Sequence, residues 1–253
     1  MLDGTIAALY RYPVKGLSGE RLSEAEVEAG SAIPFDRAYA IENGPGAFDE
    51  AAPRHLPKVT FLCLMRDERL ATLETVFAGA TSLLTISRAG ELLARGALDT
   101  AEGRIAIEAF IAREMTDELR GPPRVVSAKG HSFSDVKEKC LHIINLASVR
   151  ALEQTTGRLI DPMRFRANVL IDGLEPWAEL DLLGREIGLG CVRLQVFKRT
   201  VRCAATNVDP ATGVRGGDLP GAILDAHGLR DFGIYATVSS GGMIRAGARV
   251  EIK

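Results

Sequence analysis

The pattern of apolar and polar positions along this chain predicts many short strands. Alternating positions predict strands at residues 22–27 and 37–41, and continuous apolar runs predict strands at 6–12 and 59–64. Residues 83–87 and 91–94 flank Arg88-Ala89-Gly90, which predicts a hairpin. In the second half we expect strands at residues 124–127, 141–145, 169–171, 185–187, 192–197, 234–238 and 249–252.

Helical spacing is confined to a few segments. Apolar residues recur at helical intervals over residues 70–77. A second helix is predicted where Thr100 precedes an apolar stripe over residues 107–111, and a third between a capping Ser148 and Gly157. Many short strands with glycine-rich turns and few helices favour a mostly β protein with some α (an α+β chain), built as a barrel or a folded sheet.

Gly121-Pro122-Pro123 is the clearest interruption in the middle of the chain. We therefore divide the chain into an N-terminal β-rich domain at residues 1–120 and a β-barrel domain at residues 121–253. The length of 253 residues is enough for one large domain or for two that share an interface.

Composition narrows the class of protein. The 31 Lys and Arg nearly balance the 33 Asp and Glu, and the net charge of −2 predicts no general attraction to nucleic acid or to an anionic membrane. No run approaches the roughly 20 apolar residues of a membrane span, and the first residues lack the basic region and apolar run of a secretory signal. We expect a cytoplasmic protein that binds neither nucleic acid nor membrane.

The four cysteines are scattered without a CxxC pair, which argues against a structural zinc site and a disulfide framework. Cys63, Cys140 and Cys191 lie in apolar runs and are interpreted as core residues. Cys203 differs, because Lys198, Arg199 and Arg202 precede it within five residues and a turn-forming Asp-Pro-x-Thr-Gly follows. Nearby cations favour a thiolate, which attacks electrophiles or binds soft metals; a buried structural thiol is the alternative.

The cysteine segment, Arg202-Cys203 through Gly213, resembles the cysteine motif of the MOSC family, the molybdenum cofactor sulfurase C-terminal domain family. Further segments resemble motifs of this family and of its N-terminal β-barrel domain, in the same order along the chain: Tyr12-Pro13-Val14-Lys15-Gly16, Phe35-Asp36-Arg37-Ala38-Tyr39, His131-Ser132-Phe133-Ser134-Asp135, Arg164-Phe165-Arg166-Ala167-Asn168, Phe232-Gly233-Ile234-Tyr235 and Gly242-Met243-Ile244-Arg245-Ala246-Gly247. The resemblance covers nearly the whole chain. Gly16 and Asn207 depart from it where the family has a hydroxyl side chain.

This resemblance implies a MOSC-type β-barrel with a smaller N-terminal β-rich domain packed on it. It also implies a molybdenum cofactor (molybdopterin), a large anion with a phosphate, a pterin and a metal held by sulfur. Cys203 would be the catalytic residue and the thiolate ligand of molybdenum. The implied cofactor-binding residues are Lys15, Arg37, Arg164, Arg166, Asn168, Arg202 and Thr206.

The residues themselves leave alternatives for several of these positions. Arg164, Arg166 and Asn168 alternate, so on a strand they would share one face about 7 Å apart, either as an anion cradle or as an exposed polar face. Arg37 lies in an apolar run and needs a partner if buried, which is the cofactor or an internal ion pair. Lys15 is a phosphate contact or a surface lysine. We expect Lys15, Arg37 and Arg166 to converge in one pocket.

The function implied is a molybdenum-cofactor oxidoreductase that reduces small N-hydroxylated or related N–O and S–O compounds. The chain lacks the cysteine cluster of a plant-type iron–sulfur domain, so electrons would come from a separate donor protein of the ferredoxin or flavoprotein type. Two alternatives use the same residues. One is sulfur transfer through a Cys203 persulfide, and the other is a non-catalytic carrier of the cofactor.

Overall fold

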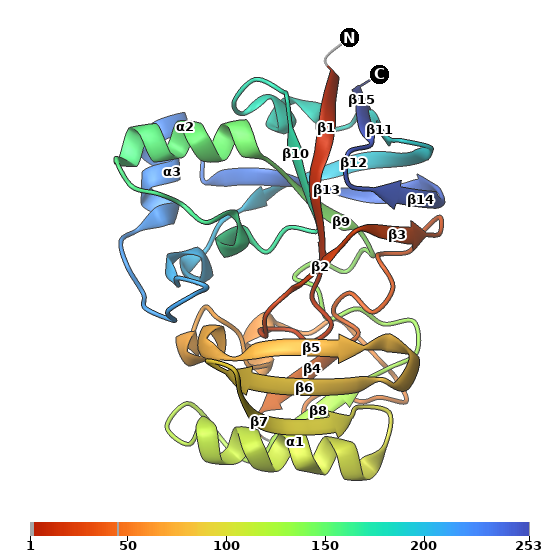
Figure 1. The fold of residues 1–253 in the computed structure, drawn as a ribbon, viewed down its shortest axis with the longest axis vertical. Helices are drawn as coiled ribbons and strands as arrows, with labels where there is room; N and C mark the ends of the chain where they lie inside the picture. The colour runs from red at the N-terminus through yellow and green to blue at the C-terminus, as the bar shows by residue number, and fades with distance from the viewer. Residues whose placement is uncertain (1–2, 45, 253) are drawn as a thin grey trace.

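The computed structural model describes residues 3–44 and 46–252; Met1 and Leu2 of the N-terminal segment considered above lie outside it. Its upper half is a closed seven-stranded barrel built from both ends of the chain (Figure 1). In spatial order the barrel strands are β10 (Val169–Asp172), β9 (Leu141–Asn145), β13 (Asp231–Ser240), β12 (Val192–Val201), β11 (Glu186–Leu189), β15 (Arg249–Ile252) and β1 (Asp3–Arg11). Pairing of β1 with β10 closes the barrel, and β9 and β10 run parallel.

Three short strands extend the barrel at its margin. Strand β2 (Glu20–Leu22) pairs with β1, and β3 (Glu24–Val27) pairs with β14 (Gly242–Arg245). Alternate residues of each barrel strand fill the interior, as in β12, where Val192, Leu194 and Val196 are buried and the residues between them are less so. The interior is therefore a packed core.

Two helices cover one side of the barrel, on the left in Figure 1. They are α2 (Leu146–Thr156) and α3 (Leu219–His227), which contact each other. Beneath them the rings of Phe165 and Phe232 stack with centroids 4.0 Å apart. Because Phe165 lies between two arginines in the sequence, this buried stack fixes the backbone that carries both cations.

The lower half of the molecule holds a three-stranded sheet, a two-stranded sheet and a helix (Figure 1). The first sheet is β5 (Glu74–Ala78), β6 (Leu83–Arg88) and β7 (Glu91–Ala97), and the second pairs β4 (Tyr39–Asn43) with β8 (Pro123–Ser127). Helix α1 (Ala101–Glu114) packs on β7. A Cβ on Gly103 would lie 2.1 Å from the Ala97 carbonyl oxygen, so only glycine allows this approach.

Six short 3-10 segments complete the secondary structure of residues 3–44 and 46–252: η1 (Lys58–Thr60), η2 (Glu68–Thr72), η3 (Gly79–Thr81), η4 (Pro162–Phe165), η5 (Ala178–Leu182) and η6 (Ala204–Asn207). Across that part of the chain, no helix is long and apolar enough to cross a membrane.

The mostly β architecture with a barrel and some helix is confirmed. So are the hairpin of β6 and β7 and the cap of α1, where the Thr100 hydroxyl accepts from the Gly103 N–H. The division near residue 121 stays a prediction. Strand pairing crosses it in both directions, since β1 pairs with β10 and β4 pairs with β8.

Three local predictions were wrong. Residues 59–64 make only an isolated bridge at Phe61 after the 3-10 turn η1. Residues 70–77 form η2 and then β5, because pairing with β6 overrides the apolar spacing. Helix α2 begins earlier than predicted, with Asn145 as its cap, and Ser148 lies inside it and donates to the buried Glu179.

Candidate functional site

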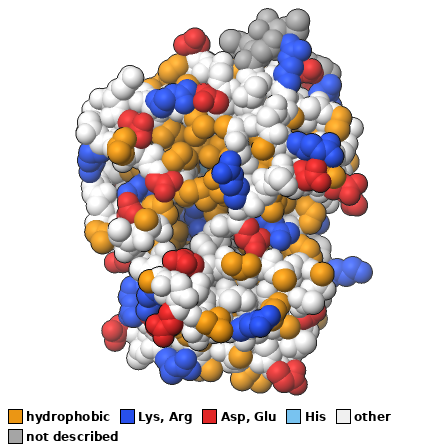
Figure 2. Space-filling view, in the orientation of Figure 1, with side chains coloured by type: hydrophobic (Ala, Val, Ile, Leu, Met, Phe, Trp, Pro, Cys, Tyr) orange, Lys and Arg blue, Asp and Glu red, His pale blue; other side chains and the backbone are white. Residues whose placement is uncertain are grey.

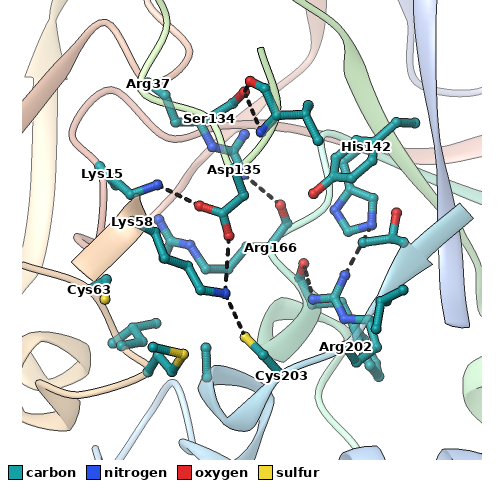
Figure 3. Close-up of a pocket in the computed structure, with 18 of the residues that line it drawn as sticks. Lys15, Arg37, Lys58, Cys63, Ser134, Asp135, His142, Arg166, Arg202 and Cys203 are labelled. Carbon is teal, nitrogen blue, oxygen red and sulfur yellow. Dashed lines mark hydrogen bonds and ion pairs between the residues drawn. The ribbon is translucent and has the colours of Figure 1, made fainter. Parts of the chain in front are cut away.

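A cavity of about 280 Å³ lies between the barrel and the lower half of the molecule (Figure 3). Five stretches far apart in the sequence line it: residues 15–16, 36–37, 58–65, 133–142 and 164–168. The end of β12, the cysteine loop that follows it and Tyr235 of β13 complete the lining. The site therefore depends on the tertiary fold and on both halves of the chain.

The lining carries many more positive than negative side chains. Its carboxylates are Asp36 and Asp135. Its eight cationic residues are Lys15, Arg37, Lys58, Arg164, Arg166, Lys198, Arg199 and Arg202. The face drawn in Figure 2 shows both signs interspersed, in keeping with the near-zero net charge. The excess of positive charge is thus local to the cavity, which attracts anions there without making the whole protein basic.

One side of the cavity holds two lysines joined by a carboxylate. The Nζ of Lys15 donates to Asp135 Oδ1 at 2.5 Å and to the Phe133 carbonyl at 2.8 Å, and the Nζ of Lys58 lies 3.6 Å from Asp135 Oδ2. Burial acts to raise the pKa of Asp135, but the two lysines outweigh it and hold that pKa well below its usual range. Asp135, whose side chain is 45% exposed, is thus an internal anion in the sense that the protein itself supplies it between two cations.

Lys58 also reaches the cysteine. Its Nζ donates to Cys203 Sγ at 3.1 Å, the contact at the lower centre of Figure 3. Burial acts to lower the pKa of Lys58, but Asp135 and the hydrogen bond to Cys203 raise it above its usual value. The thiol therefore lies next to an ammonium group and faces the cavity.

Two arginines lie against the ring of Tyr12. The guanidinium carbons of Arg37 and Arg166 are each 4.3 Å from its centroid. Both arginines adopt the left-handed backbone conformation, with φ of 51° and 52°, which is uncommon outside glycine and often occurs at functional sites. Burial raises the pKa of Tyr12 to about 12 despite these cations, so the phenol stays neutral.

The two guanidinium groups differ in their partners. Arg37 donates to both oxygens of Asp36 and to the carbonyl of Arg166. Within residues 3–44 and 46–252 the Arg166 guanidinium has no hydrogen-bond or ion-pair partner, and it contacts Tyr12. Burial, together with Arg37, lowers the pKa of Arg166 to about 10, so it remains positively charged near neutral pH. The Arg166 side chain is half-buried and lines the cavity, so its guanidinium is available to an incoming anion.

Arg202 lies beside the cysteine and also faces the cavity. Its Nη2 donates to the Phe165 carbonyl at 2.9 Å and its Nη1 lies 3.3 Å from His142 Nε2. Its Nε is buried, with no partner in the part of the chain that the structure describes. Burial, with Arg202 and Arg37 nearby, lowers the pKa of His142 well below its usual value, so the imidazole is neutral and accepts at Nε2.

The end of β12 explains how Arg202 and Cys203 reach the same cavity. On a continuous strand, neighbouring side chains would point to opposite faces. Here β12 ends at Val201, the Arg202 N–H donates to the Arg230 carbonyl, and η6 begins after Cys203. The Thr206 N–H and hydroxyl both bind the Cys203 carbonyl, which closes the turn.

Three predicted site residues are held by the protein itself. Arg164 donates to Asp209 at 2.6 Å and to two carbonyls of the cysteine loop. Asn168 bridges β1 and β9 with its amide, and Thr206 is fully buried behind the loop. The prediction that residues 164–168 form a strand face was wrong, because η4 ends there and Arg166 turns left-handed.

The other cysteines differ in position. Cys63 and Cys140 are buried and border the cavity, and burial raises the pKa of Cys140 to about 12. The prediction that Cys191 belongs to the core was wrong, because it lies in the turn between β11 and β12 and is exposed. Residues 3–44 and 46–252 contain no group of three or more His, Cys, Asp and Glu side chains arranged to hold a metal ion.

Sequence reasoning missed Lys58 and His142, and it treated Asp135 only as part of a motif. Lys58 lies outside the motifs and is 145 positions from Cys203. His142 lies in an apolar strand with no partner signal nearby. Asp135 could have been identified as a site residue from the sequence, since its motif follows in order those that carry Lys15 and Arg37.

These features fit a large anionic cofactor held by a soft ligand. Among the described residues, the cavity offers the half-buried Cys203 thiol, the Arg166 guanidinium without a polar partner, and the Arg202 guanidinium with a buried unpaired Nε. Soft thiolates bind metals such as molybdenum, and guanidinium groups bind phosphates and planar polar edges. The residues present therefore suit a molybdopterin-type group.

Comparison with known families agrees with this arrangement. The MOSC domain matches residues 128–251, and the MOSC N-terminal beta barrel domain matches residues 3–114. Together the two matches cover nearly the whole chain. The chain belongs to the family of MOSC-domain proteins with the associated N-terminal domain.

Among curated proteins, the chain is similar to mitochondrial amidoxime-reducing component 1 of Mus musculus, with 24% identity over 96% of this chain and 81% of that protein. The Homo sapiens protein of the same name is 25% identical over the same shares. Among solved structures, the YUAD protein from Bacillus subtilis is 14% identical with a TM-score of 0.46, covering 99% of this chain and 95% of that chain. YiiM from Geobacillus stearothermophilus is 24% identical with a TM-score of 0.36, covering 45% and 53%.

Proposed function

We propose that this protein binds a molybdenum cofactor in the cavity and reduces small N-hydroxylated or related N–O and S–O compounds. The observation that carries the proposal is the meeting of the Cys203 thiol with the unpaired Arg166 guanidinium in one cationic cavity. Membership of the MOSC family and similarity to proteins named amidoxime-reducing components support the same chemistry.

The residues of this chain would bind and orient the cofactor. Cys203 provides the sulfur ligand, and Arg166 and Arg202 provide charge-assisted hydrogen bonds to phosphate or pterin oxygens. Lys15 and Arg37 add positive charge, while their own carboxylate partners hold them in place. When bound, the molybdenum cofactor supplies two-electron redox chemistry and oxygen-atom transfer. Electrons would come from a separate donor protein of the ferredoxin or flavoprotein type.

The test is metal and pterin analysis of protein produced in a host that makes the cofactor. We expect near-stoichiometric molybdenum and pterin, together with reduction of an amidoxime or hydroxylamine by a chemical electron donor. Molybdenum far below stoichiometric, under conditions that load a known MOSC reductase, would refute the proposal. A persulfide on Cys203 without molybdenum would indicate sulfur transfer. Tight cofactor binding without reduction would indicate a carrier.

A further inference from the structure

The contact between Lys58 and Cys203 joins two reactive side chains at hydrogen-bond distance. The amine nitrogen and the thiol sulfur are 3.1 Å apart, although the residues come from opposite halves of the chain. Neither is sealed off from water, since the Lys58 side chain is 30% exposed and Cys203 is half-buried. A small oxidant therefore has access to both.

Both partners are held in position. The Asp135 carboxylate is 3.6 Å from the Lys58 amine and is itself fixed by Lys15. The Cys203 carbonyl accepts two hydrogen bonds from Thr206, one from its N–H at 3.0 Å and one from its hydroxyl at 2.9 Å. Bringing two groups together in advance removes most of the entropic cost of joining them.

We propose that, in the cofactor-free protein, hydrogen peroxide links Lys58 to Cys203 through a single bridging oxygen atom between the amine nitrogen and the sulfur. The bridge would be a reversible modification that blocks both side chains. It requires only this pair of residues and peroxide, so it does not depend on the proposed reductase activity.

The chemistry balances in two steps, each consuming one peroxide. In the first, the thiol sulfur attacks peroxide, the O–O bond breaks, and a sulfenic acid and one water form. In the second, the ammonium gives a proton to solvent and the sulfenic oxygen bonds to the amine nitrogen. One O–H and one N–H bond break, and the second peroxide takes up both hydrogens with two electrons to give two waters. In total one thiol, one amine and two peroxides give the bridge and three waters.

The other cysteines do not offer this geometry. Cys63 and Cys140 are buried, which limits access for peroxide. Cys191 is exposed, but its sulfur lies 3.5 Å from the Met243 carbonyl, which is not an amine. The modification should therefore be specific to Cys203, and a dithiol reductant should reverse it by cleaving the S–O bond.

The experiment treats the cofactor-free full chain with hydrogen peroxide and analyses it by non-reducing mass spectrometry. We expect a mass gain of one oxygen less two hydrogens, a cross-linked peptide pair containing Lys58 and Cys203, and loss of both on adding dithiothreitol. Lys58→Arg keeps the charge but lacks the primary amine, so Cys203 should instead proceed to sulfenic and sulfinic acids.

Lys198→Met is the matched control, because Lys198 borders the same cavity but, unlike Lys58, does not donate to Cys203, and this variant should still form the bridge. The proposal is overturned if Lys58→Arg shows the same mass gain, or if the wild type gives only sulfinic acid. It is equally overturned if the cross-linked product is a disulfide between Cys203 and Cys63, or if the bond to Lys58 contains no oxygen.

Discussion

The two sides of the cavity balance their positive charge in different ways. On the lysine side, defined as Lys15, Lys58 and Asp135, a carboxylate already lies between the cations. On the arginine side, defined as Arg166 and Arg202, the described residues offer the cations only a backbone carbonyl, an imidazole and aromatic rings. An incoming anion therefore gains most on the arginine side, where no internal anion competes with it.

The largest effect on cofactor binding is expected at Cys203, whose thiol borders both sides of the cavity. Cys203→Ser keeps a similar volume but replaces a soft ligand with a hydroxyl that is a poor ligand for a soft metal. We expect molybdenum retention and reductase activity to be lost while the thermal midpoint stays close to that of the wild type. Metal analysis together with calorimetry measures both.

The control for this variant is Cys191→Ser, since Cys191 is exposed and does not line the cavity. It should retain full molybdenum content. If Cys203→Ser unfolds the protein while the surviving fraction keeps its cofactor, Cys203 is a structural residue and not the metal ligand between the two sides of the cavity.

Much of the fold could be predicted from the sequence because it depends on local patterns. The strands of the barrel come from apolar runs and alternation, and the cap at Thr100 comes from side-chain chemistry within one turn. Errors arose where tertiary contacts outweighed local preference. Residues 70–77 have helical spacing, yet Val76 is 66% exposed while Phe77 is buried, as strand pairing with β6 requires.

The candidate site was only partly predictable, for a related reason. Motifs identified Lys15, Arg37, Arg166 and Cys203, all of which line the cavity. What no motif specified is which cations are already neutralised. That depends on contacts such as that between Lys15 and Asp135, which joins residues 120 positions apart and exists only after folding.

The second prediction tests the asymmetry between the two sides directly. Arg166→Ala should weaken binding of the whole cofactor by about 1.5–3 kcal/mol, roughly ten- to hundredfold, because a charge-assisted contact with no internal competitor is lost. The double variant Lys15→Met with Asp135→Asn removes one charge of each sign and should weaken binding less. Cofactor titration of the apo-proteins measures both. A larger loss of cofactor affinity in the double variant would show that the lysine side contributes more to binding than the arginine side.

The third prediction removes the internal anion alone. Asp135→Asn leaves Lys15 and Lys58 without a carboxylate, so binding of inorganic phosphate to the apo-protein should tighten by about tenfold, or about 1.4 kcal/mol. Calorimetric titration checks this, with Asp172→Asn as a control because that carboxylate pairs with Arg150, and neither residue lines the cavity. Unchanged phosphate affinity would show that Asp135 does not compete with anions.

The depressed pKa of Asp135 also determines the pH range over which this carboxylate stabilises the folded protein. Because that pKa is depressed in the folded state, the stabilisation from the carboxylate is fully present above its unfolded value of 3.8. It is lost as pH falls through the lower folded value. The stability difference between wild type and Asp135→Asn should therefore be constant between pH 5 and pH 8 and shrink only in more acidic solution.

The smallest effect is expected at His142, the neutral partner of Arg202. Its folded pKa lies well below the unfolded value of 6.5, so the unfolded chain takes up a proton first as pH falls. His142 therefore destabilises the folded state progressively below about pH 6.5, by up to about 1.4 kcal/mol per pH unit. His142→Gln keeps an acceptor for Arg202 but does not titrate, so its free energy of unfolding should fall less steeply between pH 6.5 and pH 5. Denaturant unfolding of both proteins across this range isolates the difference, because other titrating groups are common to both. Parallel pH profiles would mean that His142 is protonated in the folded protein, and that the arginine side carries a third positive charge.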